Sequence, residues 1–155
     1  MTATISARPT RATLVKAGAG AAAAAAGLIA YGAYGDPSAP DNQKSAVPFL
    51  IGIAVVVSAI VFGLLVPRAL RAIEAGAPTA ARWCLGHGIA SVVLLIVFWS
   101  GATLIVGAAA VLLAAVGRQR YTSRATPYSV ALWLAGSAIA ATVVWTVLTN
   151  TVLSN

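Results

Sequence analysis

Charged side chains are scarce in this sequence, in which 155 residues include three acidic and ten basic ones. Only 8% of the residues are charged while 60% are hydrophobic, and the mean hydropathy is +0.92. In soluble globular domains about a quarter of the residues are charged, because a polar exterior must face water. The composition therefore excludes an ordinary water-soluble domain and favours lipid as the outer solvent.

The three acidic residues all lie in polar connecting segments: Asp36, Asp41 and Glu74. Ion-coupled carriers generally place a carboxylate inside the membrane, where its protonation controls binding. Its absence argues against a self-contained ion-coupled carrier. The sequence also lacks a carboxylate pair, a serine with a base beside it and a glycine-rich phosphate loop. We therefore expect no enzymatic activity.

Cysteine and histidine occur once each, as Cys84 and His87. A lone cysteine excludes an internal disulfide. The two residues are three apart and share one face of a helix, so His87 could bind a cofactor, either with Cys84 as a metal ligand or alone as an axial haem ligand. Zinc needs three or four protein ligands, so we predict no metal site. The sequence favours a neutral, hydrogen-bonded His87 and an inert Cys84.

Basic residues give the chain a net charge of +7, which in a soluble protein would suggest nucleic-acid binding. They are scattered near the ends of apolar segments, however, rather than gathered on one element. Membrane proteins collect such residues in cytoplasmic loops. We therefore attribute the charge to topology and expect no nucleic-acid partner.

The longest uncharged stretch runs from Arg82 to Arg118. One straight helix over it would exceed about 50 Å at about 1.5 Å per residue, whereas the hydrocarbon layer is about 30 Å thick. Division at Ser100-Gly101 gives two spans of about 17 residues each. Trp99 then lies at interface depth. The stretch predicts a transmembrane helical hairpin.

Together these patterns predict an all-α integral membrane protein, a five-span transmembrane helix bundle. Residues 1–12 are expected to form a disordered cytoplasmic tail, followed by a single transmembrane domain over 13–153. The predicted spans are 13–34, 48–66, 81–99, 102–117 and 128–148. A second interpretation reads residues 1–32 as a cleaved secretory signal with a weak site at Ala30-Tyr31-Gly32.

Prolines and glycines mark the predicted connections around the second span. Residues 35–48 contain several turn formers and are expected to be extended. Pro48 suits the first position of the second span, and Pro67 is expected to end or kink it. Residues 67–78 favour a short interfacial helix, which Gly76 would stop.

The distribution of basic residues predicts the orientation. With five spans and a cytoplasmic amino terminus, Lys44 is the only basic residue outside and the carboxy terminus is outside too. The Ala-, Val- and Gly-rich, arginine-biased composition favours a GC-rich bacterial genome, and hence the inner membrane. The basic residues on the cytoplasmic side would be Arg8, Arg11, Lys16, Arg68, Arg71, Arg82, Arg118, Arg120 and Arg124.

Small and hydroxyl-bearing residues inside the spans suggest helix contacts. Small residues let helix backbones approach closely. The candidate interface positions are Gly18, Gly20, Gly86, Gly88, Ala131 and Ala135. We expect the hydroxyls to bond to backbone carbonyls rather than line a path. These hydroxyls belong to Ser58, Ser91, Thr103, Ser137, Thr142 and Thr146.

The favoured function is an accessory or scaffolding subunit, or a self-associating membrane protein, whose partners are the lipid bilayer and another membrane protein or itself. One alternative is a small transporter or facilitator component using the Ser and Thr positions. A second is a haem- or metal-binding redox subunit using His87.

Overall fold

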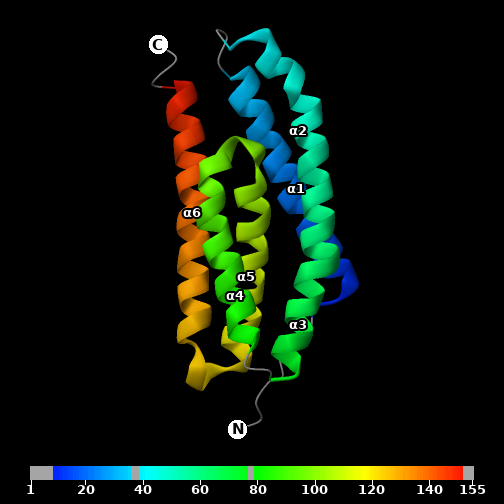
Figure 1. Ribbon diagram of the computed structural model, residues 1–155, viewed down its shortest axis with the longest axis vertical. Helices are drawn as coiled ribbons and strands as arrows, with labels where there is room; N and C mark the ends of the chain where they lie inside the picture. Colours follow the sequence, from blue (N-terminus) through cyan, green and yellow to red (C-terminus); the bar gives the residue numbers. More distant parts are fainter. Residues whose placement is uncertain (1–8, 36–38, 77–78, 152–155) are drawn as a thin grey trace.

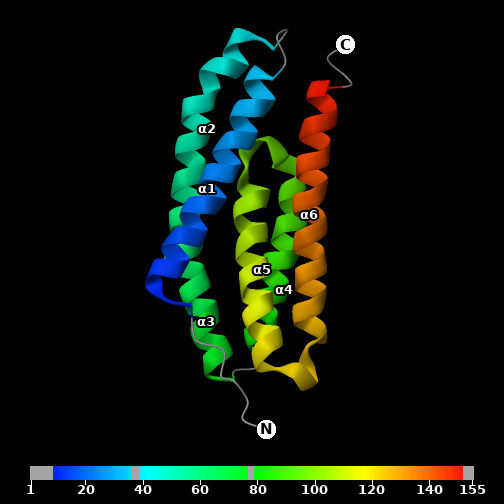
Figure 2. The same ribbon diagram turned by 180° about the vertical axis from the view of Figure 1, so that it is seen from behind.

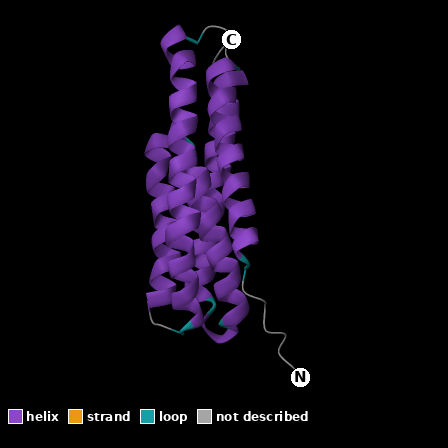
Figure 3. Ribbon diagram, turned by 90° about the vertical axis from the view of Figure 1, so that its right-hand side faces the viewer, coloured by secondary structure: helices purple, strands orange, loops and turns teal. Residues whose placement is uncertain are grey.

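The computed structural model describes residues 9–35, 39–76 and 79–151, and within these ranges it is helical without a strand (Figure 1). Five helices are long and apolar enough to cross a membrane, which confirms the predicted five-span, all-α fold. The elements are α1 (Arg11–Tyr34), α2 (Asp41–Ile60), η1 (Val61–Leu65), α3 (Val66–Glu74), α4 (Thr79–Val93), η2 (Leu94–Ser100), α5 (Ala102–Arg120), η3 (Thr122–Arg124) and α6 (Thr126–Thr151). All five spans follow one long axis (Figure 3).

The spans form two groups that meet on α5. Helices α4, α5 and α6 pack against one another, and α1 pairs with α2. Viewed from behind, α1 and α2 lie on one side of α5 and α6 lies on the other (Figure 2). In the most apolar stretch of α5 50% of the residues are buried, against 28% in each of the other four spans. Helix α5 is therefore the centre of the bundle, and the other four turn much of their surface outward to lipid.

One end of the bundle, here called the basic end, contains the end of α3, the start of α4, the end of α5 and the start of α6 (Figure 1). The Tyr121 hydroxyl donates to the Ile73 carbonyl at 2.6 Å, and Arg120 donates to the Glu74 carbonyl at 3.1 Å. The last carbonyls of a helix have no partner within it, so these bonds cap α3 and tie it to α5. Lys44 lies near the other end, on α2. The arginines of α3, α4 and α5 thus lie at one end of the bundle (Figure 1), while the side of the membrane that they face stays a prediction.

The hairpin predicted at Ser100-Gly101 is confirmed. Gly101 has φ 68°, in the left-handed region that glycine adopts without strain, and α5 begins directly after it. The Thr103 hydroxyl donates to the Leu94 carbonyl at 2.9 Å, where the backbone of η2 leaves regular α geometry at Val97 (φ −118°, ψ 39°). Trp99 is 55% exposed at the tip of this hairpin.

The second span corrects two predictions. Residues 41–48 were expected to be extended, with Pro48 starting the helix, but α2 begins at Asp41 and Pro48 lies inside it. Pro48 has no N–H for the Lys44 carbonyl, and the Tyr34 hydroxyl donates to that carbonyl instead, at 3.2 Å. The helix can begin at Asp41 in part because a carboxylate in the first turn interacts favourably with the positive end of the helix dipole. The hydroxyl of Tyr34 on the neighbouring helix thus supplies the hydrogen bond that Pro48 cannot donate.

Pro67 does not end the second span either, because a continuous helical segment runs over Asp41–Glu74. The chain widens into the π turn η1 just before the proline, where the Val66 N–H bonds to the Val61 carbonyl five residues back. A proline cannot bond to the carbonyl four residues earlier, and a wider turn is one way to absorb that loss. Residues 67–74 consequently continue the span, and residues 77–78 lie outside the described residues. Leu70 and Ile73 of α3 are buried, and Gly76 (φ 69°) follows its end as predicted.

At the amino terminus the helix begins two residues before the predicted start. Thr10 caps it, since its hydroxyl oxygen accepts a bond from the Thr13 N–H at 3.2 Å. Residues 1–8 of the predicted tail, and Asp36 and residues 152–153, fall outside the described residues.

Candidate functional site

Hydroxyl groups inside the spans donate to backbone carbonyls, as expected. One of them joins two helices, because the Ser58 hydroxyl donates to the Gly18 carbonyl at 2.7 Å. The others stay within their own helix or hairpin: Ser91 to Gly88, Thr103 to Leu94, Ser137 to Leu134, Thr142 to Ala138 and Thr146 to Thr142. Their donors are therefore used in holding the bundle together.

His87 differs from every other polar side chain that the structure describes. It is 8% exposed, and its Nδ1 lies 2.8 Å from the Trp83 carbonyl oxygen, one turn earlier on α4. A carbonyl can only accept, so Nδ1 carries a proton, and in the neutral imidazole Nε2 is then the nitrogen with the lone pair. Among the described residues, Nε2 is the only buried side-chain nitrogen or oxygen with no partner. A buried polar atom without a hydrogen-bond partner lowers stability by about 1–3 kcal/mol, so the position of Nε2 requires a physical explanation.

An apolar groove lies between α4 and η1, with His87 in its lining. Its volume is about 450 Å³, within the usual range of ligand pockets. Helix α4 forms one wall, Val61 and Leu65 of η1 form the facing wall, and Val106 of α5 contributes from the central helix. The α4 residues recur every three or four positions and so share one face: Thr79, Arg82, Trp83, Gly86, His87 and Ala90.

Cys84 does not share this groove, although it is only three residues from His87. Its side chain is fully buried in the hydrophobic core with residues of the other helices. Among the described residues, no three His, Cys, Asp or Glu side chains come close enough to hold a metal ion. Cys84 thus belongs to the hydrophobic core, whereas His87 lines the groove.

The predicted interface residues fall into two sets. Some lie inside this chain: a Cβ on Gly18 would be 3.0 Å from the Phe62 Cβ, and one on Gly88 would be 3.1 Å from the Ala131 Cα. Ala131 and Ala135 are fully buried on α6. Gly20 and Gly86, by contrast, face open space, since a Cβ on either would meet nothing within 4 Å.

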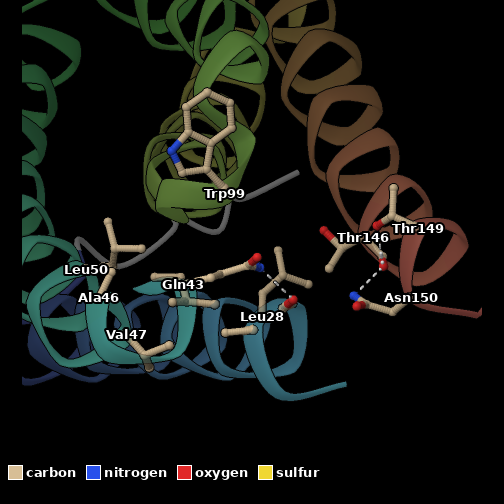
Figure 4. Close-up of a pocket in the computed structure, with 12 residues that line it drawn as sticks. Leu28, Gln43, Ala46, Val47, Leu50, Trp99, Thr146, Thr149 and Asn150 are labelled. Atoms are coloured by element: carbon tan, nitrogen blue, oxygen red, sulfur yellow. Dashed lines mark hydrogen bonds between the residues drawn. The ribbon is translucent and has the colours of Figure 1, made fainter. Parts of the chain in front are cut away.

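A second cavity, of about 410 Å³, lies at the end away from the arginines, where the α4–α5 hairpin stops short of α1, α2 and α6 (Figure 4). Gln43 donates to the Gly32 carbonyl at 3.2 Å and Asn150 to the Thr146 carbonyl at 2.9 Å, as the dashed lines mark. No charged residue lines this cavity, and these amide donors already have acceptors.

Comparison with known proteins adds no assignment, because the chain matches no protein-family model, no curated protein and no solved structure.

The sequence indicated His87, but it did not indicate that η1 forms the opposite wall of the groove. The sequence signal for this wall is Pro67: a proline inside an apolar helical segment requires either a widened turn before it or a break in the helix.

Proposed function

We propose that this chain is a non-enzymatic subunit of a membrane assembly, packed against a second copy of itself or another membrane protein. The observation that carries the proposal is the α1 outer face, formed by Gly20, Ala23, Ala24 and Gly27. All four residues are exposed, and a Cβ on either glycine would meet nothing within 4 Å. Their spacing places them on one side of the helix over about two turns.

Glycine on a lipid-facing helix surface is costly without a neighbour. It lowers helix stability by about 1 kcal/mol relative to alanine and offers lipid no side chain. Against another helix, the same absence of side chain allows close backbone contact. Gly18 shows this use within the chain, where it admits Phe62. The α1 outer face repeats that composition toward the outside, which supports a partner helix there.

A transport path is less well supported. A path through the bundle needs polar groups free to replace water around the solute. The six intramembrane hydroxyls donate instead to backbone carbonyls. Asp41 and Glu74 lie at the ends of the second span, so neither supplies an intramembrane carboxylate.

Native mass measurement in mild detergent tests the proposal. The unaltered protein should run as a complex heavier than one chain, and Gly20→Leu should release the single chain because leucine fills the contact face. Gly136→Leu on α6 is the matched control, since Gly136 also faces open space but lies outside the α1 outer face. A single chain from the unaltered protein, or a complex that survives Gly20→Leu, would overturn the proposal.

A further inference from the structure

We propose that the groove between α4 and η1 holds one acyl chain of an anionic phospholipid, whose phosphate binds Arg82 at the mouth of the groove. The groove follows α4 from Thr79, its first residue, to Ala90. A helix rises by about 16 Å between these two positions, and half of the hydrocarbon layer is about 15 Å thick. The groove therefore has the length of one lipid chain within one leaflet.

The lining supplies the apolar contact that an acyl chain needs. Val61 and Leu65 form one wall, and Val106 contributes from the central helix. His87 does not interrupt this surface with a polar group, because its Nε2 is covered and its Nδ1 bonds to the Trp83 carbonyl. A partner helix about 10 Å across would occupy about 1,200 Å³ over the same length. The groove volume of about 450 Å³ suits a slender chain instead.

Positive charge is found at one end of the groove. Arg82 is the only charged residue in the lining, and it is exposed toward the basic end. Arg68 is exposed too, and it follows Leu65 by three residues, so helix periodicity places it on the side of the opposite wall. Neither guanidinium has a hydrogen-bond or ion-pair partner among the described residues.

This arrangement of charge is complementary to an anionic lipid. A guanidinium binds a phosphate through charge-assisted hydrogen bonds, and basic groups near the membrane surface attract anionic headgroups. Thr79 adds a hydroxyl at the same end of the lining. The groove thus offers a cationic mouth to a headgroup and an apolar channel to the chain that follows it.

Gly86 leaves room for that chain beside the α4 backbone. A Cβ at this position would meet no atom of the protein within 4 Å. Glycine lowers helix stability by about 1 kcal/mol relative to alanine, so it brings no gain on a helix surface that nothing approaches. An acyl chain lying against Gly86 accounts for its place in the groove.

Native mass spectrometry of the purified, full-length protein in detergent tests the site. Phosphatidylglycerol, which is anionic, and phosphatidylcholine, which is zwitterionic, are titrated separately with identical acyl chains. We expect one saturable phosphatidylglycerol adduct per chain, with a Kd about tenfold below that of phosphatidylcholine, the value of one charge-assisted hydrogen bond. Arg82→Gln should remove this difference. Arg118→Gln is the matched control, because Arg118 is exposed at the end of α5 and does not line the groove.

A groove-filling variant tests the place of the acyl chain. Gly86→Leu should prevent the adduct of either lipid, and Gly136→Leu on α6 should bind as the unaltered protein does. Excess inorganic phosphate should not displace the lipid, because phosphate has no chain to fill the groove. Phosphatidylglycerol brominated in its acyl chain should quench Trp83 fluorescence in a variant with phenylalanine at the other three tryptophan positions.

Equal affinity for the two lipids would refute the proposal, as would an equal loss of affinity in Arg82→Gln and Arg118→Gln. An adduct that survives Gly86→Leu, displacement of the lipid by phosphate, or unquenched Trp83 would refute it as well. The site is independent of the assembly role because the groove lies within one chain. Gly20→Leu should therefore bind phosphatidylglycerol as the unaltered protein does.

Discussion

At the scale of single residues, close packing in this bundle depends on a few positions where a side chain would not fit. Gly101 is one of them, because it combines φ 68° with a neighbour from another span. A Cβ there would lie 2.7 Å from the Ala25 Cβ. Because Gly101 has no side chain, the hairpin tip can pack closely against α1.

Gly101→Ala is expected to destabilise the protein by about 1–3 kcal/mol, through backbone strain and the clash with Ala25. Gly136→Ala is the control, since its added methyl meets open space and improves helix propensity by up to about 1 kcal/mol. Denaturant titration in detergent, followed by circular dichroism, measures both. Equal stability of the two variants would contradict the packing described at the hairpin.

At the scale of elements, the second span shows how a helix contains two prolines and remains continuous. The break in hydrogen bonding at Pro48 is compensated from outside, by Tyr34 of α1. The break near Pro67 is compensated from within, by the π turn η1. The first solution ties α1 to α2, and the second shapes the groove beside His87.

Tyr34→Phe is expected to destabilise the protein by about 1 kcal/mol, because the Lys44 carbonyl then loses its donor. In a Pro48→Ala background the alanine N–H can bond to that carbonyl, so Tyr34→Phe should cost much less. A double-mutant cycle of unfolding free energies measures the difference. Additive effects of the two substitutions would show that the tyrosine does not serve the proline.

At the scale of the whole molecule, the odd number of spans places the start of α1 and the end of α6 at opposite ends of the bundle (Figure 1). The arginines of α3, α4 and α5 lie together at the basic end, and Lys44 lies toward the other. The positive-inside rule then predicts which end is cytoplasmic.

A reporter that is active only outside the cytoplasm should be active when fused after Asn155 and inactive when fused after Gly76. A reporter that is active only in the cytoplasm should give the reverse pattern. Both fusions are measured in whole cells, with expression checked by immunoblot. A silent reporter after Asn155, with an active cytoplasmic reporter there, would show the predicted orientation to be wrong.

The sequence by itself determined the class of the protein and most of its span boundaries. Scarce charge and long apolar stretches leave few folds that satisfy the backbone in lipid, so the helix count follows from composition and length. The turn at Gly101 also follows, because an uncharged stretch too long for one crossing needs a turn and glycine provides it. His87 could also be identified from the sequence, because it is the only histidine and lies in an apolar helix.

Only the tertiary structure decided how the second span accommodates its two prolines and where the side chains of α4 pack. Local propensity predicts a helix start at Pro48 and an end or kink near Pro67, but the Tyr34 hydroxyl and the π turn replace the missing bonds, and the contact with Tyr34 does not follow from local pattern. The surroundings of Cys84 and His87 were also decided there, because Cys84 lies in the hydrophobic core while His87 lines the groove at η1. Which side chain meets which partner depends on packing between helices, and packing is set by contacts distant in the chain.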